Sequence, residues 1–285
     1  MLIIGCGYLG RRLAARLSEG GASVSGLVRS RETAARLAAL GIAPLRADLD
    51  RPLPPLPTRG TSLFYLAPPP REGREEPRLA RLLAALEQGG QPRRILYLST
   101  TGVYGDCGGE WVDETRPPNP QADRARRRWD AERRLRRWQA RRGGELVILR
   151  VAGIYGPGRL PLERLRRGLP MVSAAESPWT NRIHVDDLVT ACVAAMERGL
   201  DGGIYNACDG HPGTMRDYFD RVADHAGLPR PPQIRLSEAE GRLSAGLRSY
   251  LRESRRLSNR RLREELGVTL RYPTLEAGLA ACPPG

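Results

Sequence analysis

The sequence predicts an α/β fold, in which helices cover both faces of a doubly wound parallel sheet and a small C-terminal domain follows. Short apolar runs alternate with helix-patterned segments through the first half of the chain, which is typical of repeated β-α-β units. These runs are apolar throughout, as expected for strands buried on both faces of a parallel sheet. A glycine-rich turn also follows the first run directly.

The elements of this half follow from the spacing of its apolar residues. We expect strands at residues 2–4, 23–28, 62–67, 94–99 and 146–151, and helices at residues 9–18, 32–40, 77–88 and 124–142. Leu13 and Leu17 fall at helical spacing in the first helix. In the last helix Ala131, Leu135 and Trp138 recur at i, i+4 and i+7, which indicates an apolar stripe packed on a core.

The glycine-rich turn lies between a strand and a helix, the context that a dinucleotide-binding fingerprint requires. Gly5 permits the tight turn, Gly7 lets the backbone approach a pyrophosphate, and Gly10 lets the helix pack closely on the strand. Free N–H groups at the helix start, near Tyr8 and Leu9, would face the phosphates. These five residues therefore predict a Rossmann-type fold with a bound dinucleotide, and a purely structural turn is the alternative.

A glycine- and proline-rich stretch at residues 153–158 predicts a loop at the end of the regular half. We expect a dinucleotide-binding domain of residues 1–152, with residues 180–208 returning to it. Residues 153–179 and 209–285 would then form a smaller substrate domain.

The composition excludes several classes of protein. The chain has 285 residues, of which 40% are hydrophobic and 27% charged, as in a soluble globular protein. No apolar run approaches the roughly 20 residues that cross a bilayer, and no signal segment precedes the first strand, so we expect a cytoplasmic protein. The five cysteines form no Cys-x-x-Cys pair, which argues against a disulfide framework and against a metal site.

The formal net charge of +14 comes from arginine alone, because all 46 basic residues are arginine and lysine is absent. Ten of these arginines lie in residues 124–142. The apolar stripe of that helix indicates that they cover a solvated face. Steering of an anionic substrate and nucleic-acid binding are the alternatives, and the known nucleic-acid motifs are missing from the chain.

Four further segments resemble the extended short-chain dehydrogenase/reductase family, which contains sugar-nucleotide epimerases, dehydratases and reductases. They are LSTTGVYG at residues 98–105, RVAGIYGPG at 150–158, NRIHVDDL at 181–188 and IYNA at 204–207. They occur in the order that the family has, and the short region between 159 and 181 is similar to its compact, atypical members. The resemblance implies a small-molecule substrate such as a sugar nucleotide, and a homodimer.

The end of the second strand favours NADP over NAD. An NAD enzyme commonly offers an acid there to the ribose hydroxyls, whereas this chain has Arg29 and Arg31. A guanidinium can hold the extra 2′-phosphate with two hydrogen bonds. In so arginine-rich a chain, the alternative is that both are ordinary surface residues. The resemblance adds cofactor contacts from Asp48 with Leu49, from Leu66 and Ala67, and from Ser99.

The family works with a Ser or Thr and a Tyr-x-x-x-Lys pair, and here the resemblance identifies Thr100 with the first role. The pair is excluded, since the chain has no lysine. If Glu132 corresponds to the glutamate that follows the family lysine by four residues, then Arg124 has the tyrosine position and Arg128 the lysine position. Arg128 could bind a ribose, but an arginine cannot exchange protons at ordinary pH. The nearest substitute acids are Tyr104, followed by Asp106, Tyr155 and His184.

Two classes of function stay open. One is an NADP-dependent oxidoreductase or epimerase, in which Tyr155, Arg159 and Arg182 border the substrate and the arginines bind a diphosphate. The other is a protein that binds NADP as a sensor without turnover.

Overall fold

The computed structural model describes residues 1–283 and is built on seven parallel strands in the order β12-β7-β5-β4-β1-β2-β3. The strands are β1 (Leu2–Ile4), β2 (Ser25–Val28), β3 (Ala43–Arg46), β4 (Ser62–Tyr65), β5 (Arg94–Thr100), β7 (Glu145–Val151) and β12 (Ile204–Ala207). The α/β prediction is confirmed. The strand order reverses between β1 and β4, and at such a point a crevice opens at the carboxyl ends of the strands.

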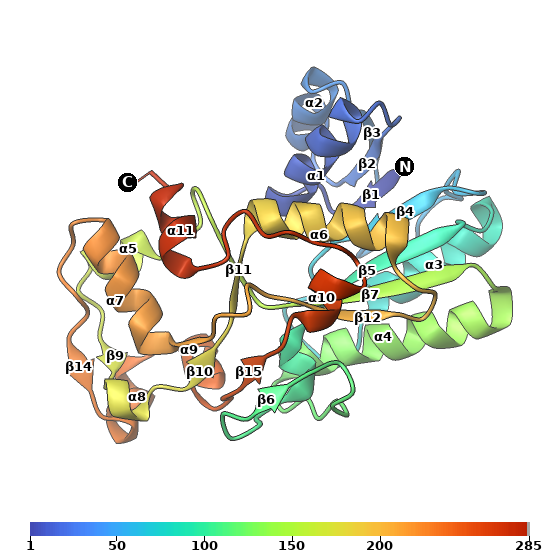
Figure 1. The fold of residues 1–285 in the computed structure, drawn as a ribbon. Coiled ribbons are helices and arrows are strands. Elements are labelled where there is room, and N and C mark those ends of the chain that lie inside the picture. Colours follow the sequence, from blue (N-terminus) through green and yellow to red (C-terminus); the bar gives the residue numbers. More distant parts are fainter. Residues whose placement is uncertain (284–285) are drawn as a thin grey trace.

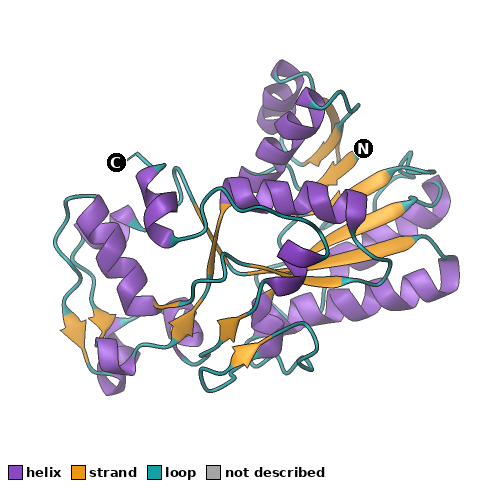
Figure 2. Ribbon diagram, viewed as in Figure 1, coloured by secondary structure: helices purple, strands orange, loops and turns teal. Residues whose placement is uncertain are grey.

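Helices cover both faces of the sheet (Figure 1, Figure 2). They are α1 (Tyr8–Glu19), α2 (Arg31–Ala39) and α6 (Val185–Arg198) on one face, and α3 (Pro77–Gly89) and α4 (Asp123–Arg142) on the other. Side chains alternate along β1, so Ile3 packs with the first group while Leu2 and Ile4 pack with the second. In α4 the predicted stripe of Ala131, Leu135 and Trp138 is buried against the sheet.

A buried ion pair fixes α4 on the sheet. Glu132 is 0% exposed and accepts hydrogen bonds from Arg150 of β7 at 2.9 and 3.2 Å. It also accepts from the Ser99 hydroxyl of β5 at 2.6 Å and from Arg136 at 3.1 Å. These contacts set the helix register and so direct the first turns of α4 toward the carboxyl ends of β5 and β7.

The rest of the chain builds a smaller lobe, seen to the left in Figure 1, and the short elements that join it to the sheet. Its helices are α5 (Leu162–Arg166), α7 (Met215–His225), α8 (Ala239–Arg242), α9 (Ala245–Leu251) and α11 (Leu275–Ala280), with strands β9 (Met171–Val172) and β14 (Gln233–Ile234) and 3₁₀ turns η2 (Ala174–Glu176) and η3 (Leu236–Glu238). The joining elements are η1 (Thr101–Tyr104), β6 (Trp111–Val112), β8 (Gly153–Tyr155), β10 (Trp179–Thr180), β11 (Arg182–His184), β13 (Gly213–Thr214), β15 (Arg256–Leu257) and α10 (Arg260–Glu264). The lobe has its own apolar core around Met171, Phe219 and Val222.

One local expectation is wrong. The stretch 153–158, expected to be a loop, begins with strand β8, which pairs in parallel with β11. Since the pairing partner lies far along the chain, local composition did not indicate it. The predicted boundaries of the two domains stay a prediction. Within residues 1–283, no helix is long and apolar enough to cross a membrane.

Candidate cofactor and substrate sites

A cavity of about 570 Å³ lies at the carboxyl ends of β1 to β4. It is lined by Gly5, Cys6, Gly7, Leu27, Val28, Arg29, Ser30, Thr33, Ala47, Asp48, Leu49, Asp50, Ala67, Pro68, Pro69, Arg71 and Arg78. The glycine turn is at its base, and the first turn of α2 is at one side. Its position is that of a dinucleotide in a doubly wound sheet.

The three glycines differ in what surrounds them. Gly5 has φ of +99°, and a Cβ there would lie 2.7 Å from the Ala67 nitrogen. A Cβ on Gly10 would lie 2.5 Å from the Gly5 oxygen. On Gly7, which lines the cavity, a Cβ would meet no protein atom within 4 Å. Gly5 and Gly10 are thus required by the chain's own packing, whereas Gly7 keeps open the space that a pyrophosphate would fill.

Of the two arginines after β2 that are predicted to bind the 2′-phosphate, only one lines the cavity. Arg29 lines the cavity together with Ser30 and Thr33, and Arg31 does not. Ser30 caps α2, its hydroxyl accepting from the Thr33 N–H at 3.1 Å. Arg29 forms no ion pair with an acid of the described residues, so its guanidinium is free for an anion. The hydroxyls of Ser30 and Thr33 are cavity groups that the sequence analysis missed.

On the opposite side, Asp48 and Leu49 line the cavity. The Asp48 carboxylate accepts from the N–H of Asp50 at 3.0 Å, which shapes the loop after β3. Asp50 itself forms a two-point ion pair with Arg78 at 2.7 and 2.6 Å. The hydrogen bond from Arg78 lowers the pKa of Asp50, so this acid is negative and offset by its own partner.

The remaining predicted cofactor residues lie in different surroundings. Ala67 lines the cavity, while Leu66 and Leu9 are buried in the core between the sheet and α1. The Ser99 hydroxyl donates to Glu132. Tyr8, the first residue of α1, donates from its hydroxyl to the Pro157 carbonyl at 2.9 Å and so links the glycine turn to the loop after β8.

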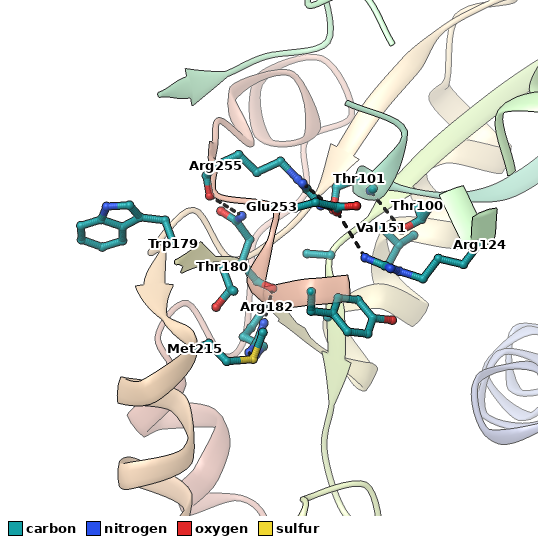
Figure 3. A pocket seen from close by; sticks show the side chains of 15 residues that line it. Thr100, Thr101, Arg124, Val151, Trp179, Thr180, Arg182, Met215, Glu253 and Arg255 are labelled. Atoms are coloured by element: carbon teal, nitrogen blue, oxygen red, sulfur yellow. Dashed lines mark hydrogen bonds and ion pairs between the residues drawn. The ribbon is translucent and has the colours of Figure 1, made fainter. Parts of the chain in front are cut away.

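A second cavity, of about 130 Å³, lies at the carboxyl ends of β5 and β7, at the same edge of the sheet. Figure 3 shows it from close by. Its lining residues are Thr100, Thr101, Gly102, Arg124, Val151, Ala152, Gly153, Trp179, Thr180, Asn181, Arg182, Met215, Tyr250, Glu253 and Arg255. The Thr100 Oγ1 accepts from the Gly102 N–H at 3.2 Å, which leaves the hydroxyl proton free to be donated into the cavity.

An ionic cluster forms one wall of this cavity. The buried Glu253 lies between Arg124 and Arg255, with Oε2 accepting at 3.2 Å from the first and 3.1 Å from the second. Arg124 also donates to the Ser249 hydroxyl at 2.5 Å, and its guanidinium lies 3.8 Å from the centre of the Tyr250 ring. No sequence motif marks Glu253, which lies in an arginine-rich stretch and reaches the cavity only through the fold.

Arg182 is the predicted substrate residue that the structure places in the cavity. Its guanidinium stacks 4.2 Å from the centre of the Tyr218 ring and donates to the Asn181 carbonyl at 2.9 Å. It forms no ion pair with a carboxylate of the described residues, and burial lowers the pKa of its guanidinium. A third cavity, of about 170 Å³, shares this arginine and is also lined by Asp209, whose pKa burial raises to about 7.

Arg128, placed at the lysine position by sequence, lies between the two cavities without lining either. It donates to the Ala67 carbonyl at 3.2 Å and to the Tyr97 hydroxyl at 3.4 Å. Ala67 lines the cofactor cavity, so Arg128 contacts the backbone beside a bound nucleotide rather than the space that the nucleotide would occupy.

The other predicted residues lie outside the substrate cavity. Tyr104 is 1% exposed and donates to Asn206 at 2.8 Å, and burial raises its pKa to about 12. Tyr155 is fully buried and donates to the Thr274 carbonyl at 3.4 Å; burial raises its pKa as well. Arg159 is exposed, with its guanidinium 4.7 Å from the centre of the Tyr8 ring.

The two further acids considered also have local partners. Asp106 accepts from the N–H of Ser254 at 2.8 Å, and His184 accepts from the N–H of Asp186 at 3.3 Å. Burial lowers the pKa of His184, which keeps it neutral. Across residues 1–283, the His, Cys, Asp and Glu side chains form no cluster of three that could hold a metal ion.

Comparison with known proteins agrees with this geometry. The family described as NAD dependent epimerase/dehydratase matches residues 79–208. A putative NAD-dependent epimerase/dehydratase from Methylobacillus flagellatus is 30% identical, with a TM-score of 0.71 over 98% of this chain and 96% of that one. This chain belongs to the NAD-dependent epimerase/dehydratase family. The chain therefore has the Rossmann-type, NAD(P)-binding fold of that family, as expected from the glycine turn.

Two more solved structures are similar to this chain. A conserved protein of unknown function from Silicibacter pomeroyi is 35% identical, with a TM-score of 0.80 over 98% of this chain and 96% of that one. The UDP-glucose 4-epimerase of Thermotoga maritima, solved with UDP-glucose, is 21% identical, with a TM-score of 0.77 over 98% and 96% of the two chains. At that identity the likeness to the epimerase shows the fold.

Proposed function

We propose that this protein is an NADP-dependent oxidoreductase or epimerase that acts on a sugar nucleotide or another small hydroxyl or carbonyl compound. The observation that carries the proposal is the pair of cavities at one edge of the sheet. One is open at Gly7 and Arg29, and the other is lined by Thr100. A nicotinamide dinucleotide in the first supplies hydride transfer when bound. The chain's residues position the substrate next to it.

The charges of the second cavity support an anionic substrate. Three guanidiniums line it, from Arg124, Arg182 and Arg255, against the single carboxylate of Glu253. Arg182 has no carboxylate partner in the described chain, and a diphosphate would provide an anion for its guanidinium. Thr100 can donate its proton to a substrate oxygen. The sugar-nucleotide epimerase of the same fold supports this substrate class.

The cofactor preference rests on Arg29 and Arg31. Replacing both in an Arg29→Ala/Arg31→Ala variant should weaken NADPH binding far more than NADH binding, because NADPH alone carries the 2′-phosphate. Calorimetric titration with each nucleotide measures the two losses. Equal losses would overturn the NADP assignment.

A second candidate is an NADP-binding sensor without turnover. It is favoured by the arginines at both positions where the family has its tyrosine and lysine, since neither exchanges protons. Single-turnover oxidation of bound NADPH separates the candidates, using a panel of sugar nucleotides and simple ketones. Consumption of NADPH by any member supports the enzyme, and tight binding with no consumption supports the sensor.

A further inference from the structure

One residue that lines the substrate cavity has a buried carboxylate oxygen without a hydrogen-bond partner. Glu253 is 4% exposed and lines the cavity. Its Oε1 has no partner among residues 1–283, although its Oε2 accepts from two guanidiniums. An ionised oxygen left unpaired in the interior costs more than the roughly 1–3 kcal/mol of a neutral group. The cavity is therefore prepared for a group that donates to Oε1.

The orientation of Glu253 is fixed from both sides. Arg255 donates to Oε2 with both terminal nitrogens at 3.1 Å and to the Gly105 carbonyl at 2.6 Å. Arg124 reaches the same oxygen from α4, as Figure 3 shows. Because both guanidiniums bind one oxygen, the carboxylate cannot turn without losing an ion pair. Oε1 is thereby held as a single buried acceptor on a residue that lines the cavity.

The surrounding charges select the donor. An ammonium donor would meet three guanidiniums, those of Arg124, Arg182 and Arg255, and would be repelled. A neutral hydroxyl has no such penalty. A hydroxyl can also accept a hydrogen bond, and the Thr100 proton is available to it or to an oxygen beside it. A substrate hydroxyl thus complements both Thr100 and Glu253.

We propose that Glu253 Oε1 accepts a hydrogen bond from a hydroxyl of the substrate and so determines which substrates the cavity takes. Arg124, at the helix position where the family has its tyrosine, holds this carboxylate in place from α4. The inference rests on the proposed function, because it concerns the sugar portion of a sugar nucleotide. It assigns to the C-terminal lobe a contact that α4 itself cannot make.

The test compares UDP-glucose with UDP, titrated calorimetrically into the NADP-loaded protein. The two probes differ by the hydroxyl-bearing sugar and by the extra negative charge that the terminal phosphate of UDP carries near neutral pH. A hydrogen bond to a charged group contributes about 1.5–3 kcal/mol, so UDP-glucose should bind at least about tenfold more tightly than UDP. In Glu253→Gln the amide oxygen faces the arginines and the NH₂ group faces the cavity, so this preference should fall to about threefold or less. The affinity for UDP should stay within about twofold.

Two further variants separate recognition from structure. Glu253→Asp keeps the charge and both ion-pair partners but withdraws the oxygen, so it should also lose the preference for UDP-glucose. The control Glu240→Gln alters an exposed acid that pairs with Arg248 in the same lobe, and it should bind as the unaltered protein does. Retained NADP affinity shows that each variant is folded.

Four results would overturn the inference. A preference for UDP-glucose that survives in both Glu253 variants would show that another residue receives the sugar. Parallel losses for UDP and UDP-glucose would show a structural role for Glu253. UDP binding without any preference for the sugar would remove the inference and leave the proposed function standing, whereas binding of neither probe would remove both it and the sugar-nucleotide substrate class.

Discussion

The two cavities lie at the same edge of one sheet and are built in opposite ways. The cofactor cavity depends on three glycines within one turn, Gly5, Gly7 and Gly10. Their lack of a Cβ permits the tight turn and leaves space at Gly7. The substrate cavity depends on charged side chains brought together from distant segments, such as Arg124 and Glu253. A site of the first kind is disrupted by added atoms. A site of the second kind is disrupted by a removed charge.

The largest effect is expected beneath the substrate cavity, where α4 is held to the sheet. Arg150→Met should destabilise the protein by about 3–5 kcal/mol, because the fully buried Glu132 loses its principal counter-charge. Urea unfolding measures the change. The double variant Arg150→Met/Glu132→Leu removes both charges and should recover much of the loss. If the single variant costs no more than the double, charge pairing does not hold this side together.

A pH-dependent effect follows from Asp209, which lines the cavity of about 170 Å³ that shares Arg182 with the substrate cavity. Burial raises the pKa of its carboxyl to about 7, from 3.8, so the folded state binds a proton that the unfolded state releases. Its contribution to stability is complete below about pH 4 and is lost as the pH rises to about 7. From the size of the shift, the loss is at most about 4 kcal/mol.

Asp209→Asn keeps the acceptor for the His211 N–H and cannot ionise. It should match the unaltered protein near pH 4 and exceed it in stability at pH 8, as measured by thermal unfolding at each pH. Parallel curves for the two proteins would show that this carboxyl does not titrate between these limits.

The cofactor cavity offers a matched pair of added methyl groups. Gly10→Ala should destabilise the protein by about 1–3 kcal/mol, because its Cβ would lie 2.5 Å from the Gly5 oxygen. Gly7→Ala should unfold at the unaltered temperature, since no protein atom lies within 4 Å, yet lose NADP affinity by roughly tenfold or more through lost phosphate contacts. Thermal unfolding and calorimetry report the two effects. A loss of stability in Gly7→Ala would contradict the separation.

The smallest expected effect distinguishes the two arginines after β2. Arg29 lines the cavity and Arg31 does not, so Arg29→Ala should weaken NADPH binding by about tenfold, the worth of one charged hydrogen bond. Arg31→Ala should change it by about threefold or less. Titration with NADPH measures both. The reverse order would place the 2′-phosphate at the start of α2 instead.

The same contrast explains what the sequence could predict. The glycine turn is local, and each glycine has a steric reason to be there, so the fold class and the family followed from the residues. The helix register did not follow, because Glu132 is held by contacts with Ser99 of β5 and Arg150 of β7 that only the fold creates. The pairing of β8 with β11 did not follow, since it joins segments that local composition treats separately.

The ionic cluster that forms one wall of the substrate cavity could not be predicted for the same reason. Glu253 follows α9, and its position against Arg124 depends on how the small lobe folds back on the sheet. Nor could spacing show that Tyr155 is fully buried or that Arg159 stacks on Tyr8. A polar residue in a turn looks the same in sequence whether its side chain faces ligand or core.

Tyr8 links the glycine turn to the loop that follows β8. Its backbone begins α1 directly after the glycine turn, and its hydroxyl donates a hydrogen bond to the Pro157 carbonyl in the loop after β8. We therefore expect a nucleotide that shifts the turn to shift the loop after β8 as well. Occupancy of one cavity should change the affinity of the other, by the same factor in either direction, and titrating UDP with and without NADP would measure that factor.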